Sequence, residues 1–167
     1  LTVGELKIEN GTTTVSTLPP AGRPIVYSNL NLSAHNFSFS KNFTFEISAS
    51  LPGNGSLGIT GNAGPVSEKD ASDTPLNAKI NLKHFDPVAA GIIEPDQGIR
   101  MVADITADAI SDGQTLTSKG TIHAENLQLV RNGSPTPHPV DITYAVRHNL
   151  DARTGQVAMC SRRQVGW

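Results

Sequence analysis

Residues 42–51 have the sequence NFTFEISASL, which identifies the fold class more clearly than any other segment. Apolar residues occupy every second position from Phe43 to Leu51, and Thr, Glu and Ser fill the positions between them. A period of two places the apolar side chains on one face of a β-strand and the polar side chains on the other. Strands that are dry on one face and wet on the other are typical of antiparallel sheets.

The same alternation recurs along most of the chain, in residues 76–82, 99–107, 116–124 and 142–148. Residues that tolerate a positive φ separate these segments, at Gly53-Asn54-Gly55 and Asp112-Gly113. Asn10-Gly11 predicts a further hairpin, between Leu6/Ile8 and Thr13/Val15. The sequence therefore predicts a mainly β fold with a long curved antiparallel sheet, either open as a groove or packed as a β-sandwich.

Two stretches depart from the strand pattern. Residues 86–93 read DPVAAGII, in which Asp86 suits a helix N-cap and Pro87 the first helical position. We therefore expect one short helix near residues 86–93, ending before Pro95. Residues 160–167 fit no strand template, so we expect one antiparallel β region over residues 1–159 and an atypical, disordered tail from 160 to 167.

Composition and charge exclude several classes of function. The 167 residues include 13 basic and 15 acidic side chains, for a formal net charge of −2, and no basic stripe occurs. Such a balance argues against a nucleic-acid partner. Cys160 is the single cysteine, so no intrachain disulfide is possible.

The residue types that carry catalysis or bind metals do not form a recognisable site. The five histidines have no metal-ligand spacing with one another or with the cysteine. Asp104 and Asp108 lie on the polar face of one strand at a separation of about 13 Å, which is too wide for a shared proton. Asp70 and Asp73 are interpreted as part of an acidic loop. The sequence therefore predicts no catalytic residue, metal or cofactor.

The apolar face is the informative feature, because it recurs on many strands while one short helix is available to cover it. Its residues are mainly aliphatic, and a smooth aliphatic surface suits acyl chains better than a closely interlocked core. The residues predicted to line a lipid groove are Phe43, Phe45, Ile47, Leu76, Ile80, Leu82, Met101, Ile105 and Ile122.

The order of the segments resembles a known family. The residues concerned are LKIENGT at 6–12, IVYSNLNL at 25–32, GSLGITGNAGP at 55–65, Phe85-Asp86-Pro87 and Gly120-Thr121-Ile122. Over about residues 1–159, this order resembles the C-terminal region of the AsmA family of bacterial envelope proteins.

The resemblance implies a non-catalytic segment in the periplasm, attached to the inner membrane through an N-terminal segment absent from this sequence, and involved in outer-membrane assembly. AsmA-like proteins are similar in architecture to bridge-like lipid transfer proteins. The implied partners are phospholipids or other acyl-chain lipids, together with envelope proteins.

Two other functions compete with lipid handling. The first is a structural β-sandwich domain in an envelope or surface scaffold or an adhesin, whose apolar face is closed inside a core. The second is an enzyme such as a glycan hydrolase, which needs a convergent pair of carboxylates that the sequence does not offer.

Overall fold

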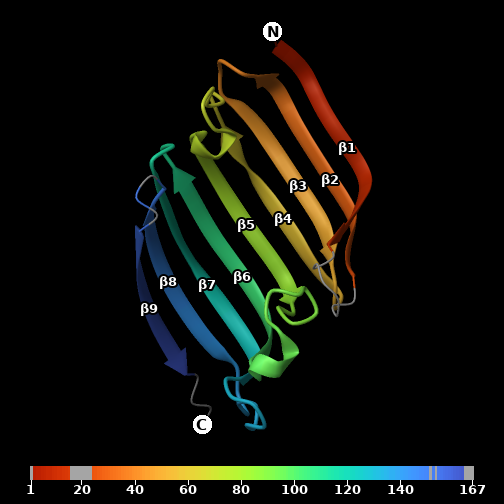
Figure 1. Cartoon of the computed structure of the whole chain (residues 1–167), viewed down its shortest axis with the longest axis vertical. Coiled ribbons are helices and arrows are strands. Elements are labelled where there is room, and N and C mark those ends of the chain that lie inside the picture. Colours follow the sequence, from red (N-terminus) through yellow and green to blue (C-terminus); the bar gives the residue numbers. More distant parts are fainter. Residues whose placement is uncertain (1, 16–23, 151, 153, 164–167) are drawn as a thin grey trace.

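The computed structural model describes residues 2–15, 24–150, 152 and 154–163. Within these residues, nine strands form one antiparallel sheet in which strands that are consecutive in sequence lie side by side (Figure 1). The strands are β1 (Thr2–Val15), β2 (Ile25–Ser38), β3 (Phe43–Leu51), β4 (Gly55–Ala63), β5 (Leu76–Phe85), β6 (Arg100–Ser111), β7 (Thr115–Gln128), β8 (Val140–Asn149) and β9 (Thr154–Arg163). Two short 3₁₀ turns, η1 (Ala71–Asp73) and η2 (Pro95–Gln97), lie in the connections.

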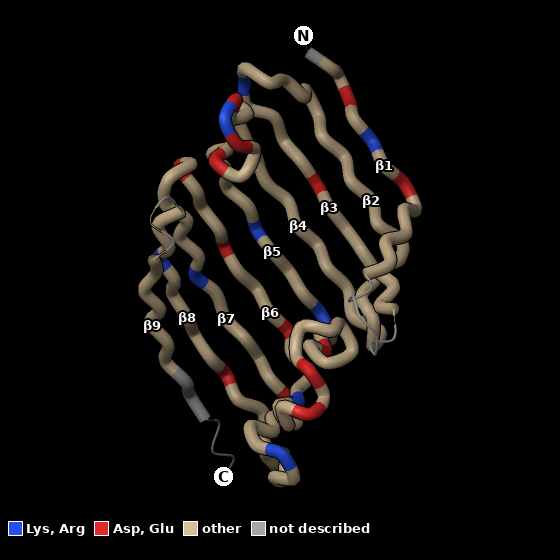
Figure 2. The backbone as a smooth tube through the Cα atoms, viewed as in Figure 1, with Lys and Arg blue, Asp and Glu red and all other residues tan. Residues whose placement is uncertain are grey.

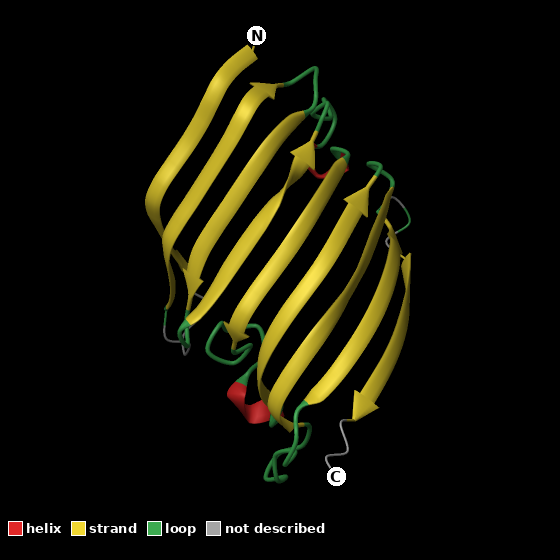
Figure 3. Ribbon diagram, turned by 180° about the vertical axis from the view of Figure 1, so that it is seen from behind, coloured by secondary structure: helices red, strands yellow, loops and turns green. Residues whose placement is uncertain are grey.

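The predicted mainly β, antiparallel fold is confirmed, in its open form. Seen from behind, the strands make a single layer, and no second sheet lies against them in the described part of the chain (Figure 3). The predicted faces of β5 are also confirmed, because Lys79 and Lys83 are exposed while Ala78 is buried and Ile80 is half-buried. Figure 2 shows that β2 and β4 carry no Lys, Arg, Asp or Glu.

Two of the predicted turns connect strands as expected. Gly53 and Asn54 adopt φ values of 82° and 66° between β3 and β4. Between β6 and β7, the Asp112 carboxylate accepts hydrogen bonds from the backbone N–H groups of Gln114 and Thr115, at 2.9 and 2.7 Å. These two bonds lower the pKa of Asp112, because they stabilise its ionised form.

The predicted hairpin at Asn10-Gly11 is wrong, because β1 continues through it to Val15. Asn10 has a φ of 54°, and the register with β2 shifts between Ile8 and Gly11 and again between Gly11 and Thr13. The Asn10 backbone N–H is satisfied by Asn31 Oδ1 of β2, at 2.9 Å. A bulge absorbs the positive φ without reversing the chain, so the Asn-Gly pair bends the strand and does not end it.

The predicted helix at 86–93 is also wrong, because the segment makes one closed turn. Asp86 Oδ1 accepts from the N–H groups of Val88 and Ala89, at 2.9 and 3.0 Å. Gly91, with a φ of 67°, then ends the turn: its N–H bonds to the Val88 carbonyl, and the next N–H bonds to the Pro87 carbonyl. This paired pattern is the Schellman motif that terminates helices, and here it follows the cap too closely for a helix to form.

The turn at 86–93 packs on β2 at one end of the sheet. Tyr27 donates its hydroxyl hydrogen to the Ala90 carbonyl, at 2.8 Å, and Pro87 is fully buried. A Cβ placed on Gly53 would lie 3.2 Å from the Ala89 Cβ, so the β3–β4 turn also contacts this loop. The loop therefore closes the sheet at the end where β3 finishes and β4 begins.

The predicted boundary at residue 159 differs from the structure, in which β9 extends to Arg163. Arg163 pairs with Val140, and the register with β8 is continuous from there to the pair Asn149–Thr154. The physical reason is that a ladder is made by backbone groups, so it does not require alternating side chains on the added strand. Residues 164–167 lie outside the described residues.

The cap at Asp86 predicts a loss of stability when its carboxylate is removed. Asp86→Ala leaves two backbone N–H groups without an acceptor, so we expect the free energy of unfolding to fall by about 1 kcal/mol. Urea denaturation followed by circular dichroism measures this change. Asp96→Ala, at an exposed position in η2, is the matched control and should stay within about 0.5 kcal/mol of the wild type. Equal losses in both variants would contradict the capping role.

Candidate functional site: an uncovered apolar face

The register of the strands aligns apolar residues into rows that cross the sheet. Residues directly opposite one another on neighbouring strands point to the same face. One row crosses every strand from β1 to β9, and we call it the central row. Its members are Ile8, Leu32, Ile47, Ile59, Ile80, Ala107, Gly120, Tyr144 and Met159.

Two further rows flank the central row on the same face. The first consists of Leu6, Ala34, Phe45, Gly61, Ala78, Ala109, Ser118, Val146 and Val157. The second runs from β3 to β8 through Ala49, Leu57, Leu82, Ile105, Ile122 and Ile142. We call the three rows together the apolar face.

The structure brings the predicted groove residues onto this one side of the sheet. Phe45, Ile47, Ile80, Leu82, Ile105 and Ile122 belong to the three rows. Phe43 and Leu76 lie on the same side of the sheet, because each of them is directly opposite Ala63 of β4. Met101 shares this side by alternation with Ala103 and Ile105.

The apolar face lacks a covering layer in the described part of the chain. Apart from Pro87 in the loop at 86–93, the buried apolar side chains of the described residues are all alanines: Ala34, Ala49, Ala78, Ala90, Ala103, Ala107, Ala109 and Ala124. Each of the nine predicted groove residues is half-buried, neither enclosed nor fully exposed. At the two margins of the sheet, Leu6 is 45% exposed and Met159 is 67% exposed. A closed core would bury the large side chains as well as the alanines.

Residues with small side chains are adjacent in the middle of the apolar face, so side chains project less from the sheet there than around them. Ala107 and Gly120 are neighbours in the central row, and Gly61, Ala78, Ala109 and Ser118 are consecutive in the adjacent row. Ala78 and Ala109 are only 5% and 8% exposed although no layer covers them in the described chain, so taller neighbouring side chains must shield them. Position 120 accommodates only glycine, because a Cβ atom there would clash with the carbonyl oxygen of Thr106.

Sequence reasoning missed several members of the rows, chiefly Leu32, Ile59, Ile142, Tyr144 and Val146. Alternation in 142–148 already assigned three of them to one face of a strand. Their alignment with Ile80 and Ile105 depends on the pairing register between strands, and the alternation within a single strand does not determine that register.

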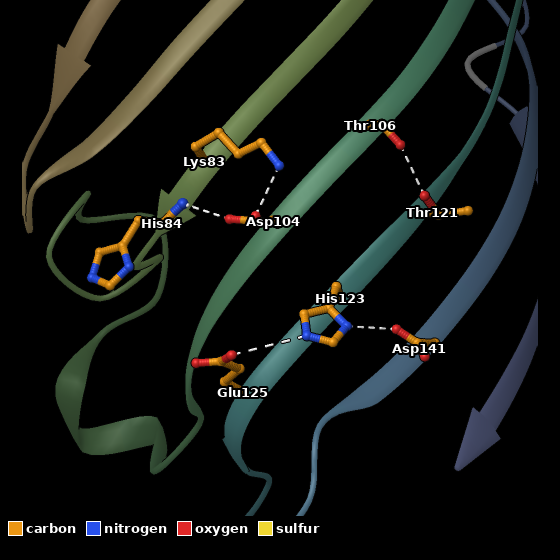
Figure 4. Close-up of polar contacts among 8 residues, drawn as sticks. All are labelled: Lys83, His84, Asp104, Thr106, Thr121, His123, Glu125 and Asp141. Atoms are coloured by element: carbon orange, nitrogen blue, oxygen red, sulfur yellow. Dashed lines mark hydrogen bonds and ion pairs between the residues drawn. The ribbon is translucent and has the colours of Figure 1, made fainter. Parts of the chain in front are cut away.

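Cross-strand polar contacts occupy the opposite face (Figure 4). Lys83 Nζ lies 2.9 Å from Asp104 Oδ2, and Asp104 Oδ1 accepts from the His84 backbone N–H at 2.8 Å. Thr106 and Thr121 share a hydrogen bond of 2.8 Å. The backbone bond from His84, followed by the bond from Lys83, lowers the pKa of Asp104. These contacts tie β5 to β6 and β6 to β7.

His123 is a second titratable group with close contacts on this polar face. Its Nδ1–H donates to Asp141 Oδ1 at 2.6 Å, and its Nε2 lies 3.9 Å from Glu125 Oε1. The hydrogen bond to Asp141 raises the pKa of His123, with smaller contributions from the charges of Asp141, Glu125 and Asp104. A histidine–carboxylate pair on an exposed strand face stabilises the sheet locally. It is not joined to a nucleophile by any contact in Figure 4.

The larger hollows in the sheet also lie on the polar face. One, of about 790 Å³, is lined by Lys119, Arg147 and Gln156 among other residues. A neighbouring one, of about 690 Å³, is lined by Lys79, Thr106 and Thr121 among others. Apolar side chains line both hollows beside these charged and hydroxyl groups: Ile110, Ala145 and Ala158 in the first, and Ile80 and Ala107 in the second.

The described residues contain no set of three or more His, Cys, Asp or Glu side chains placed to hold a metal ion. They also contain no helix with the length and apolarity needed to cross a bilayer. No protein-family model, curated protein or solved structure matches this chain. Its function is therefore inferred from its own residues and geometry.

The contact between His123 and Asp141 predicts a pH dependence with a definite sign. Because folding raises the pKa of His123, the pair stabilises the fold fully below the ordinary histidine pKa of about 6.5. That contribution is lost as the pH rises through the higher pKa of the folded state. In an NMR titration, Asp141→Asn should lower the pKa of His123, whereas Asp108→Asn, on a neighbouring part of the polar face, should leave it unchanged. An unaltered titration in Asp141→Asn would contradict the assignment.

Proposed function

We propose that this chain is a non-catalytic segment of an AsmA-like periplasmic protein, which shields or conducts phospholipid acyl chains on its apolar face during outer-membrane assembly. The observation that carries the proposal is the central row, which continues from β1 to β9 with no charged residue and no covering layer in the described residues. The family resemblance in the order of segments agrees with this function and with an anchor in the inner membrane.

The length of the central row suits an acyl chain. Strands lie about 4.8 Å apart, so the eight intervals from β1 to β9 extend over roughly 38 Å. The hydrocarbon core of a bilayer is about 30 Å thick and is filled by two layers of acyl chains. A single acyl chain can therefore lie within the row without reaching either margin of the sheet.

The energy of such binding comes from many small contributions. Each CH₂ group that is fully buried contributes roughly 0.8 kcal/mol. A chain on a one-sided face buries about half of its surface, so roughly 0.4 kcal/mol per CH₂ is reasonable. Ten or more carbons then give several kcal/mol without any specific polar contact. Binding of this kind depends on chain length and tolerates different headgroups.

The two faces of each strand differ sharply, which suits a surface that holds lipid on one side. Ile80 belongs to the central row, while Lys79 and Asn81 beside it are exposed on the polar face. Ile105 likewise lies between Asp104 and Thr106, which belong to the polar contacts. A lipid tail on the apolar face is therefore separated from the charged groups by the sheet itself.

Photo-crosslinking tests where lipid contacts the protein. A photoreactive amino acid at Ile80 or Ile105 should crosslink to phospholipid, in cells or with the purified protein and phospholipid vesicles. The matched probes are at Lys79 and Thr106, one residue away on the other face, and they should not. If the probes at Ile80 and Ile105 capture only protein, the apolar face is a closed core.

A charge in the central row should interrupt the dry path. Ile80→Asp places a carboxylate between Ile59 and Ala107, its neighbours in the row, and should reduce the lipid recovered with the purified protein at least threefold. Asn81→Asp, which adds the same charge to the polar face, should retain wild-type lipid. Circular dichroism checks that both variants remain folded. Equal lipid recovery from the two variants would exclude this face as the binding surface.

The alternative function is a structural β-domain in an envelope or surface scaffold or an adhesin. It requires a second protein layer over the apolar face, contributed from outside the described residues. The half-buried state of Phe45, Ile80 and Ile105 favours the lipid function, since the described chain itself supplies no such layer.

A further inference from the structure

A polar hollow lies at the end of the sheet where β6 begins and β7 ends. Its volume is about 430 Å³, and it is lined by Pro95, Gly98 and Arg100 from the β6 side and by Gln128 and residues 131–133 from the β7 side. Arg100 and Gln128 are partners in the ladder between the two strands, and the other lining residues belong to the loops before β6 and after β7. These two loops lie together at this end of the sheet (Figure 1).

Close packing and hydrogen bonds hold the two loops against each other. Gly98 is buried with a φ of 77°, and a Cβ atom there would clash with the backbone nitrogen of Arg131. Gln128 Nε2 donates to the Val130 carbonyl at 2.9 Å, and the Gly133 N–H donates to the same carbonyl at 3.0 Å. The backbone that carries Arg131 is therefore fixed beside the start of β6.

The hollow is lined by two positive charges and by no acidic side chain of the described residues. Arg100 and Arg131 both line it, and neither forms an ion pair with a described residue. Glu94 and Asp96, in the turn beside it, are exposed and lie outside the lining. A guanidinium group presents its N–H donors in a planar fork that matches the oxygens of a phosphate. Two such groups at one hollow are therefore complementary to a phosphate.

We propose that the hollow between Arg100 and Arg131 binds a phosphate group. Free phosphate and phospholipid headgroups share this chemistry, and the surroundings favour a lipid as the source. Leu129 and Val130, which directly precede Arg131, are 65% and 63% exposed. Exposed apolar side chains beside the arginines suit the hydrocarbon of a lipid, whereas a free ion gains nothing from them.

The lipid source rests on the proposed function, whereas the phosphate site itself does not. Met101 follows Arg100 and lies on the side of the apolar face. A phospholipid with its acyl chain on that face near Met101 can therefore place its phosphate at the end of the sheet. The phosphate is common to all phospholipids, so the site agrees with a surface that tolerates different headgroups.

Titration of the full chain with inorganic phosphate tests the site without lipid. The side-chain Nε–Hε NMR signals of Arg100 and Arg131 should both shift during the titration. The matched signal of Arg147, on the polar face, should stay in place. Unchanged signals from both arginines, or an equal shift at Arg147, would overturn the phosphate site whatever lipid does at Ile80 and Ile105.

Vesicle flotation tests the source of the phosphate. The wild type should bind vesicles of phosphatidylglycerol more strongly than vesicles of digalactosyldiacylglycerol, which contains no phosphate. Arg100→Gln combined with Arg131→Gln should weaken binding to phosphatidylglycerol about tenfold or more, since both charged donors are lost. Lys41→Gln combined with Lys69→Gln should retain wild-type binding. This control removes the same charge from exposed positions in connections at the opposite end of the sheet (Figure 1).

The outcomes separate the site from the apolar face. Equal losses in the two double variants, with circular dichroism showing both folded, would reduce the effect to general charge attraction and overturn the proposal. Arginine signals that shift with inorganic phosphate, without arginine-dependent flotation, would overturn the lipid source and assign free phosphate. Flotation that is lost in the arginine variant and kept in Ile80→Asp would support the phosphate site and count against the apolar face.

Discussion

The pairing register between neighbouring strands is the constraint on which the apolar face depends. β3 and β4 pair without a shift, and so do β4 and β5, so Ile47, Ile59 and Ile80 stand in one line. A slip of one residue in β4 would turn Ile59 to the polar face and bring Thr60 into its place. The turn at Gly53-Asn54 prevents this slip, because its positive φ values set the length of the hairpin. The continuity of the dry surface therefore rests on turn geometry as much as on aliphatic composition.

A one-layer sheet leaves its own apolar side chains only partly removed from water. Globular domains usually solve this by packing a second layer against the first. Here the loop at 86–93 covers one end, through Pro87 and the contact of Tyr27 with Ala90, and the centre of the face stays open in the described residues. The alanines are buried by their taller neighbours, so the surface is low in the middle. Such a surface gains stability from whatever covers it, whether lipid, a second copy or another protein layer.

The polar face supplies stability that does not depend on a cover. Lys83 and His84 bond to Asp104, Thr106 bonds to Thr121, and His123 bonds to Asp141. Each contact joins neighbouring strands at an exposed position, so its contribution is modest and sensitive to salt. These groups stabilise the sheet on the polar face, whereas the three rows of mainly apolar side chains lie on the opposite face.

Local sequence is enough to assign residues to a face, because side chains alternate at every strand position and Ile80 and Lys79 must therefore point in opposite directions. It is also enough for the turns at Gly53-Asn54 and Asp112-Gly113, where bonding within a few residues sets the conformation. The bulge at Asn10 is different, since it depends on a hydrogen bond to Asn31 of the neighbouring strand. Residues 86–93 likewise form a single turn and no helix. This loop is held on β2 by the hydrogen bond from Tyr27 to Ala90, which joins residues far apart in the chain. The single layer of the described sheet is the largest feature that depends on tertiary structure. Alternation is the same in an open sheet and in a sandwich, so only the arrangement of the strands in space distinguishes an uncovered face from a closed core.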